Sequence, residues 1–433
     1  MDALYIRGGK PLHGTVAVSG SKNAALPIMA ASILADEPVT LRRIPDLTDV
    51  NVLALLLGHL GIEGKRDRDG VWNLAPRDSS PDLCTAPYRL VRRMRASFCV
   101  LGPLLARRGR AIVALPGGCQ IGSRPVDLHL RGLAALGADI TLKRSYVVAR
   151  AKRLRGARIS LLGPNGPTVT GTANVMSAAV LARGQTIITD AAREPEIVDL
   201  GNFLISLGAK IDGLGTSLLE INGVEQLGGA DYGVIPDRIE TATLIVATAI
   251  TRGSIIVTSV EPGHLSAVLK VLGRAGVELM ATNETISVTS LRRIGPIKII
   301  AGPYPGIPTD VQAQLTALAT VGSAPSRIAD EVFPERFRHV AELRRLGANV
   351  VVRDGVAAVS PVARLSGAEV MANDLRASAA LALAGLAARG TTIIRGVHHL
   401  DRGYERLEAK LRHLGADVWR GGASRATRAM QAA

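Results

Sequence analysis

The chain has 433 residues, of which 47% are hydrophobic but only 3% aromatic; this length suits two domains with cores of small aliphatic side chains. The formal net charge of +15 favours anionic partners, while the scarcity of aromatic residues argues against single-stranded nucleic acid, which needs stacking surfaces. No apolar run is long enough for a membrane span, no secretory signal is recognised, and three cysteines do not suggest a disulfide framework. We therefore expect a cytoplasmic protein without membrane insertion.

A helix that ends in glycine recurs six times along the chain. Because glycine accepts a positive φ, it is the favoured residue just after a last helical turn. The spacing of roughly 70 residues indicates an internal repeat. The glycines that mark it are Gly61, Gly137, Gly208, Gly276, Gly347 and Gly415.

Each repeat is predicted to run helix, strand, helix, strand. Three of the first helices are apolar on nearly all sides, which indicates burial; they span 23–34, 173–181 and 375–387. The strands that follow are predicted at 111–115, 186–189, 254–258 and 391–395, and the fourth repeat, near 323–329, is the least regular. The pattern predicts an α/β protein with three repeats in each of two domains, helices inside and sheets outside. A doubly wound α/β fold is the alternative.

A polar or charged residue lies at the start of each buried helix, at an equivalent place in the repeat. Helix N-termini that converge on one face would form an anion site, because their N–H groups are free and the helix dipole is positive there. Capping is the simpler explanation for threonine and aspartate, but lysine and arginine oppose the dipole. The six residues are Lys22, Arg95, Thr172, Arg238, Asp310 and Arg376.

The segment 115–125 contains three glycines between two prolines, which predicts a mobile loop. Its Cys119 has Arg124 nearby, and a cation lowers the pKa of a thiol. Cys119 is therefore a candidate acid or nucleophile, whereas Cys84 and Cys99 are expected to be buried hydrophobic residues.

Four charged residues allow both a structural and a functional interpretation. Asp310 is either a structural acid in a first helical turn or a general base. Asp374 and Arg376 form either a local ion pair or a ligand clamp, and Arg402 lies in a charged stretch that would otherwise be assigned to the surface.

Seven motifs, in register from about residue 4 to residue 420, resemble the UDP-N-acetylglucosamine 1-carboxyvinyltransferases, a family of enolpyruvyl transferases. They include the Pro116-Gly117-Gly118-Cys119 loop with the run 124–128. The others lie at 19–25, 94–97, 236–241, 308–310, 374–378 and 401–406.

The resemblance implies a two-domain inside-out α/β barrel. We expect one domain at 22–235, a second formed by 1–21 plus 236–420, and a basic tail at 421–433. It implies transfer of the enolpyruvyl group of phosphoenolpyruvate to the 3′-hydroxyl of UDP-N-acetylglucosamine by addition and elimination, with release of phosphate. This is the first committed step of peptidoglycan synthesis, and it implies neither a metal nor an organic cofactor.

The same resemblance implies roles for individual residues. Cys119 would protonate the methylene carbon of phosphoenolpyruvate and react with fosfomycin, and Asp310 would accept the proton of the sugar hydroxyl. The phosphate and carboxylate would be held by Lys22, Arg124 and Arg402, with Arg336 and Arg376 nearby. Asn23 would position the intermediate. The remaining substrate contacts would come from Arg95, Pro125, Val126, Asp127, Leu128, Thr168, Val169, Val332 and Asp374.

One segment departs from the family pattern: Thr168-Val169-Thr170-Gly171-Thr172 replaces the usual Ser-Val-Gly-Ala-Thr. Threonine also donates hydrogen bonds, so we expect its diphosphate contact to persist with altered detail. The alternatives are enolpyruvyl transfer to shikimate 3-phosphate, against which the cysteine loop argues, a nucleic-acid-binding or RNA-end-processing relative, and a catalytically silent regulator.

Overall fold

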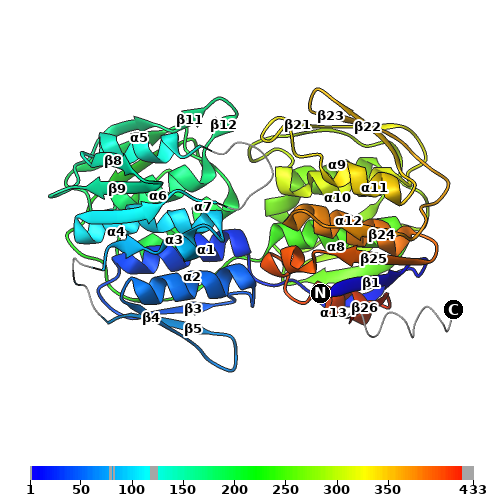
Figure 1. Ribbon diagram of the computed structural model, residues 1–433, viewed down its shortest axis with the longest axis horizontal. Helices are drawn as coiled ribbons and strands as arrows, with labels where there is room; N and C mark the ends of the chain where they lie inside the picture. Colours follow the sequence, from blue (N-terminus) through cyan, green and yellow to red (C-terminus); the bar gives the residue numbers. More distant parts are fainter. Residues whose placement is uncertain (1, 78–79, 81–82, 118–124, 422–433) are drawn as a thin grey trace. The chain divides into compact units, whose positions relative to one another are not determined.

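The computed structural model describes residues 2–77, 80, 83–117 and 125–421 (Figure 1). These form two compact units. The N-terminal unit contains the described residues from 20 to 235, and the C-terminal unit contains those from 2 to 19 and from 236 to 421. Within the described residues, no helix is long and apolar enough to cross a membrane.

The described residues form six four-stranded sheets that share one topology. In the order given below, the first strand is parallel to the second, the second is antiparallel to the third, and the third is antiparallel to the fourth. The N-terminal unit has the sheets β16 (Ala230–Gly233)-β3 (Val39–Arg42)-β5 (Trp72–Pro76)-β4 (Ile62–Arg66), β6 (Thr85–Ala86)-β7 (Arg110–Ala114)-β9 (Tyr146–Arg150)-β8 (Asp139–Lys143) and β10 (Arg158–Ser160)-β13 (Gln185–Thr189)-β15 (Leu218–Asn222)-β14 (Lys210–Asp212). The C-terminal unit has β2 (His13–Ala17)-β17 (Ser254–Thr258)-β19 (Thr285–Thr289)-β18 (Glu278–Ala281), β20 (Lys298–Ala301)-β21 (Ser326–Asp330)-β23 (Val356–Ser360)-β22 (Asn349–Arg353) and β24 (Glu369–Met371)-β25 (Thr391–Arg395)-β1 (Ala3–Arg7)-β26 (Asp417–Gly421). The N-terminal unit also contains a short hairpin of β11 (Leu162–Gly163) and β12 (Gly166–Pro167).

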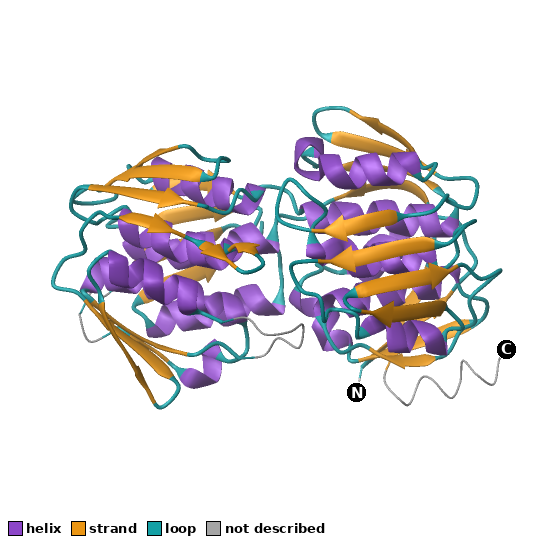
Figure 2. Ribbon diagram, turned by 90° about the horizontal axis from the view of Figure 1, so that it is seen from above, coloured by secondary structure: helices purple, strands orange, loops and turns teal. Residues whose placement is uncertain are grey.

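In each unit the sheets lie outside three buried helices (Figure 2). The buried helices are α1 (Lys22–Ala31), α4 (Leu101–Arg108) and α6 (Val169–Ala179) in the N-terminal unit, and α8 (Arg238–Thr251), α10 (Thr309–Ala319) and α12 (Leu375–Ala387) in the C-terminal unit. All 14 residues of α8 are buried, including the charged Arg238 and Glu240 of its first turn. The helices α8, α10 and α12 contact one another, and each unit has its own hydrophobic core.

A second, half-buried helix follows in each repeat and ends at the glycine identified in the sequence. These helices are α2 (Thr48–His59), α5 (Asp127–Ala135), α7 (Pro195–Ser206), α9 (Ser266–Arg274), α11 (His339–Arg345) and α13 (Leu407–His413). All six glycines have a positive φ, between 77° and 107°, which confirms the predicted helix ends.

The predicted elements agree with the observed ones to within a few residues, with one exception. Arg95 begins the 3₁₀ helix η2 (Arg95–Val100), and the α-helix itself begins only at Leu101. Pro103 lies in the first turn of α4, where its missing N–H costs no hydrogen bond. The remaining short elements are α3 (Tyr88–Val91), η1 (Ser32–Leu34), η3 (Pro262–Leu265) and η4 (Val397–Arg402).

A buried carboxylate on α7 binds the last residues of the N-terminal unit through hydrogen bonds. Asp199 accepts hydrogen bonds from the Tyr232 hydroxyl at 2.7 Å and from the Ile235 backbone N–H at 3.2 Å. Burial raises the pKa of Asp199 from 3.8 to about 6, although these two hydrogen bonds and Arg43 oppose the rise. The folded chain therefore binds a proton at Asp199 between about pH 4 and pH 6 that the unfolded chain does not bind.

This proton uptake should make the free energy of unfolding rise as the pH falls through that window, by up to about 3 kcal/mol. The variant D199N cannot take up the proton, so its unfolding free energy should lack this contribution. Urea denaturation of both proteins at pH 4.5 and pH 7 measures the difference. An identical pH dependence in wild type and variant would show that Asp199 does not titrate in this window.

Candidate functional site

The strongest cluster of charged side chains in the C-terminal unit lies at the N-terminal ends of α10 and α12. The two carboxylate oxygens of Asp310 each bind one arginine: Oδ1 accepts from Arg336 and Oδ2 from Arg376, both at 2.8 Å. The arginine side chains are 7% and 3% exposed, whereas that of Asp310 is 25% exposed. The two guanidinium groups hold the pKa of Asp310 well below its usual range, against the effect of burial, so the carboxylate is ionised at neutral pH.

The two arginines carry more N–H groups than this carboxylate can accept. Nε and Nη1 of Arg376 and Nε of Arg336 are buried and have no acceptor among the described residues. A buried guanidinium donor without an acceptor is costly, and the oxygens of an anionic ligand are acceptors of the kind that such donors bind. The cluster therefore has the composition of an anion site with an adjacent carboxylate.

Neighbouring groups fix the orientation of this cluster. Thr309 accepts a hydrogen bond from Arg336 at 3.0 Å and donates one to Asp330 at 2.6 Å. The other oxygen of Asp330 accepts from the backbone N–H groups of Val332 and Phe333 at 3.0 and 2.8 Å. Asp330 thus connects the loop that contains Val332 to the start of α10.

A buried tyrosine links all three inner helices behind the cluster. The Tyr404 hydroxyl hydrogen-bonds with Thr243 of α8 at 2.9 Å and accepts from Gln314 of α10 at 3.2 Å. Arg376 of α12 lies over its ring, 5.3 Å from the centroid. Gln314 also donates to the backbone oxygen of Asp310 at 2.8 Å. Tyr404 therefore supports both Asp310 and Arg376.

The structure separates the roles of the neighbouring Asp374 and Arg376. Asp374 caps α12, since its carboxylate accepts from the backbone N–H groups of Arg376 and Ala377 at 2.8 and 3.0 Å. The Arg376 guanidinium pairs with Asp310 instead, so the interpretation as a local side-chain ion pair is wrong. Arg402 ends η4 and is half-buried. Burial lowers the pKa of His399, and the charges of His398 and Arg402 add to this effect.

In the N-terminal unit, Lys22 begins α1 and is nearly buried. Its Nζ lies 2.7 Å from a carboxylate oxygen of Asp49 on α2. Asn23 is exposed one residue later. This pair shows that Lys22 is more than a surface cation, because burying a lysine is costly unless a partner balances its charge.

The other predicted contacts of this unit lie at the starts of α5 and α6. Arg95 donates to the backbone oxygen of Pro125 at 3.0 Å, directly before Val126, Asp127 and Leu128 at the beginning of α5. Thr168 caps α6 by accepting from Gly171 N–H at 3.2 Å, and the exposed Val169 follows. The segment 125–128 is thereby tied to the start of η2.

A buried histidine lies beneath the start of α6. His129 Nε2 is 3.2 Å from the Thr170 hydroxyl, and its Nδ1 is 2.9 Å from the Asn174 side chain. Thr170 is one of the residues that depart from the family pattern. Its hydroxyl therefore serves an internal hydrogen bond that glycine could not make.

Two predicted site residues, Cys119 and Arg124, lie outside the described residues. Cys84 and Cys99 are buried, as expected. Four residues of the site were missed from the sequence: Asp49, Asp330, Gln314 and Tyr404. Only Tyr404 had a signal, because it belongs to the 401–406 motif.

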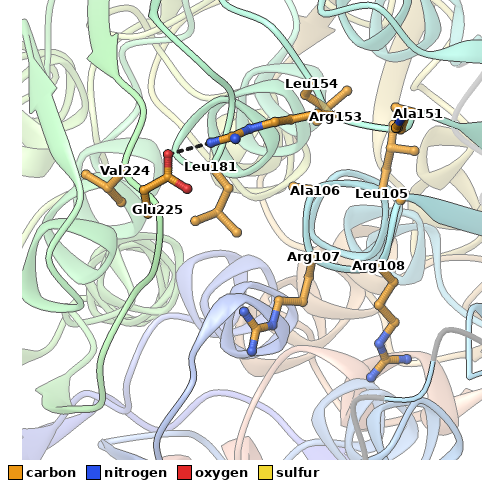
Figure 3. Close-up of a pocket in the computed structure, with 12 residues that line it drawn as sticks. Leu105, Ala106, Arg107, Arg108, Ala151, Arg153, Leu154, Leu181, Val224 and Glu225 are labelled. Atoms are coloured by element: carbon orange, nitrogen blue, oxygen red, sulfur yellow. Dashed lines mark hydrogen bonds and ion pairs between the residues drawn. The ribbon is translucent and has the colours of Figure 1, made fainter.

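A cavity of about 300 Å³ in the N-terminal unit is a separate feature, beside the C-terminal end of α4 (Figure 3). Arg107, Arg108, Lys152 and Arg153 contribute cations to its lining, and Arg153 pairs with Glu225. Arg108 donates to the backbone oxygen of Leu60 at 2.5 Å. None of the predicted substrate residues lines this cavity, so we do not place the reaction there.

Comparisons with known proteins show which family the chain resembles. Residues 6–411 match the family model of EPSP synthase (3-phosphoshikimate 1-carboxyvinyltransferase). The chain is 49% identical, over 97% of its length and 99% of the relative's, to UDP-N-acetylglucosamine 1-carboxyvinyltransferase of Nitratidesulfovibrio vulgaris.

Solved structures show the same relationship. The enolpyruvyl transferase NikO from Streptomyces tendae aligns with a TM-score of 0.87 at 27% identity, over 98% of this chain and 99% of NikO. An EPSP synthase from Acinetobacter baumannii has the same fold, with a TM-score of 0.71 at 17% identity, over 98% of this chain and 100% of that structure. The chain therefore belongs to the EPSP synthase family of carboxyvinyl transferases.

Proposed function

We propose that this protein transfers the enolpyruvyl group of phosphoenolpyruvate to the 3′-hydroxyl of UDP-N-acetylglucosamine, releasing phosphate. The observation that carries the proposal is the 49% identity to the Nitratidesulfovibrio vulgaris enzyme over nearly the whole chain. The Asp310 cluster supports it, since two buried arginines with unsatisfied N–H groups suit a substrate that carries both phosphate and carboxylate. In the cell, the reaction would supply peptidoglycan synthesis from the cytoplasm.

We also propose that the fold is a two-domain inside-out α/β barrel of six repeats. Six sheets of one topology and six buried helices support this description. The domain boundaries would fall near residues 22 and 235, where the chain passes between the two compact units.

Asp310 is the proposed general base for the sugar hydroxyl. In the structure it is a poor base, because both of its oxygens bind arginines and its pKa is low. An anionic substrate that accepts from the free N–H groups of Arg336 and Arg376 would share their positive charge and raise the pKa of Asp310. Substrate binding would thus activate the base only when phosphoenolpyruvate is present.

The remaining roles follow the same chemistry. Cys119 would donate a proton to the methylene carbon while the sugar oxygen attacks the adjacent carbon, giving a tetrahedral adduct. Loss of a proton from the new methyl group and departure of phosphate would then restore the double bond. Lys22, Arg124 and Arg402 would stabilise the negative charge of the adduct, and the N-terminal unit would supply the nucleotide contacts near Arg95, 125–128 and 168–169.

The test is phosphate release from phosphoenolpyruvate with UDP-N-acetylglucosamine or shikimate 3-phosphate as acceptor. We expect release with the nucleotide sugar alone. Release with shikimate 3-phosphate alone would instead support the second candidate, the activity after which the matching family is named. Lack of release with both acceptors would overturn the proposed activity.

Fosfomycin provides a separate test of Cys119. The epoxide should alkylate the thiol, so wild-type protein should gain one inhibitor mass on this residue. The variant C119D should retain some turnover, because a carboxylic acid can also donate a proton, and it should resist the drug. Full fosfomycin sensitivity of C119D would refute the assignment, and the variants C84S and C99S serve as controls that should stay sensitive.

A further inference from the structure

The described chain passes between the two units at two places, after Ser19 and after Ile235. Ser19 uses every polar group it has within the C-terminal unit. Its backbone N–H donates to Glu240 at 2.8 Å, and its backbone oxygen accepts from Asp237 N–H at 2.9 Å. Its hydroxyl donates to Glu405 at 2.6 Å. The first crossing is thus bonded directly to the second.

Lys410 of α13 completes this network. Its Nζ donates to the Ser19 hydroxyl at 2.8 Å and to Glu240 Oε1 at 2.5 Å. The side chains of Lys410 and Glu240 are 17% and 2% exposed. A charge pair buried this deeply is costly to desolvate, and a well-packed apolar pair would fill the same space. The role of the buried Lys410–Glu240 pair is therefore better explained by the geometry that it fixes than by a contribution to the free energy of unfolding.

The network sits where it can influence both predicted substrate regions. Ser19 lies three residues before Lys22 in the chain, and Glu240 lies in the first turn of α8, two residues after Arg238. Asp237 caps the same helix by accepting from the N–H groups of Ile239 and Glu240 at 2.7 and 3.0 Å. No group of the network belongs to the proposed catalytic set.

We propose that Lys410, Glu240 and Glu405 form a crossover anchor, a set of positioning residues that holds the two chain crossings in the geometry needed for substrate binding. This inference rests on the proposed function. All anchor residues lie in the C-terminal unit, so the anchor fixes how the chain leaves that unit toward Lys22 and how α8 begins at Arg238. Loosening it lowers the fraction of binding-competent protein, and the apparent affinity falls by that fraction.

The variant K410M tests the anchor, because methionine keeps the length of the side chain but not its charge. We expect the KM for UDP-N-acetylglucosamine to rise about five- to tenfold, with kcat changed less than about twofold because the anchor contacts no reacting atom. Amide exchange of Ser19, Ser21 and Asp237 should accelerate. S19A, which removes only the hydroxyl contacts, should show the same changes to a smaller degree and covers the case in which K410M does not fold.

The matched control is R420M. Arg420 pairs with Glu408 of the same helix α13 and with Asp401, but not with either crossing. R420M should therefore lose stability without a change in KM or in exchange at the crossings. Equal effects of K410M and R420M on KM, or unchanged exchange at the crossings in both K410M and S19A, would overturn the anchor. Amide exchange can be measured without enzyme turnover. It therefore tests the crossover anchor even if wild-type protein lacks the proposed activity.

Discussion

Replacing Asp310 by asparagine should lower kcat for phosphate release by about 100- to 10,000-fold. An amide has nearly the same shape as the carboxylate but cannot accept the hydroxyl proton. It also leaves Arg336 and Arg376 without a counter-charge, so the KM for phosphoenolpyruvate should not rise. Steady-state kinetics with saturating nucleotide sugar measures both values. A large fall in kcat without weaker substrate binding distinguishes a base from a binding residue.

The matched control is D330N. Asp330 accepts from Thr309 next to Asp310, forms no ion pair with Arg336 or Arg376 within the described part of the chain, and holds the Val332 loop. We expect a fall in stability and less than about a tenfold fall in kcat. If D310N kept kcat within tenfold of wild type, or if D330N reduced kcat equally, Asp310 would not be the base.

Replacing Arg376 by methionine should have the second largest effect. The change removes Nη2, which donates to Asp310, and also Nε and Nη1, which have no acceptor among the described residues. We expect kcat/KM for phosphoenolpyruvate to fall by about 30- to 1,000-fold, as for other charged partners lost from a buried site. The free energy of unfolding should fall by at most about 3–5 kcal/mol, because Asp310 keeps Arg336 and partial exposure.

Two companion variants separate charge from geometry. R376K keeps the charge but not the planar array of donors, so its kcat/KM should lie between those of wild type and R376M. The double variant D310N/R376M loses the Asp310–Arg376 ion pair only once, so its stability loss should be less than the sum of the two single losses. Additive stability losses, or an R376M enzyme with wild-type kcat/KM, would contradict the arrangement described above.

Local signals in the sequence predicted much of the fold. The glycines at the six helix ends all have a positive φ, because the steric rule behind that prediction depends only on the residue itself. The bounds 375–387, 254–258 and 391–395 match α12, β17 and β25. Strand order was not predicted, since three of the sheets described above combine strands from distant positions in the chain, as with β2 and β17.

Side-chain partners were harder to predict than positions. The helix-start residues Lys22, Asp310 and Arg376 lie where the repeat placed them, but nothing in their spacing indicates that Lys22 pairs with Asp49 or that Arg336 reaches Asp310. Such pairs depend on how helices pack in three dimensions. Asp374 is a further example, because its spacing from Arg376 allowed an ion pair between their side chains, whereas its carboxylate caps its own helix.

The most direct test of the central claim is the structure of the product formed from phosphoenolpyruvate labelled with ¹³C at carbon 2. Nuclear magnetic resonance should show a three-bond coupling between that carbon and the sugar hydrogen H3′, because the enolpyruvyl group is then attached through the 3′ oxygen. Coupling to a different sugar hydrogen, or label found only in free pyruvate, would contradict the account.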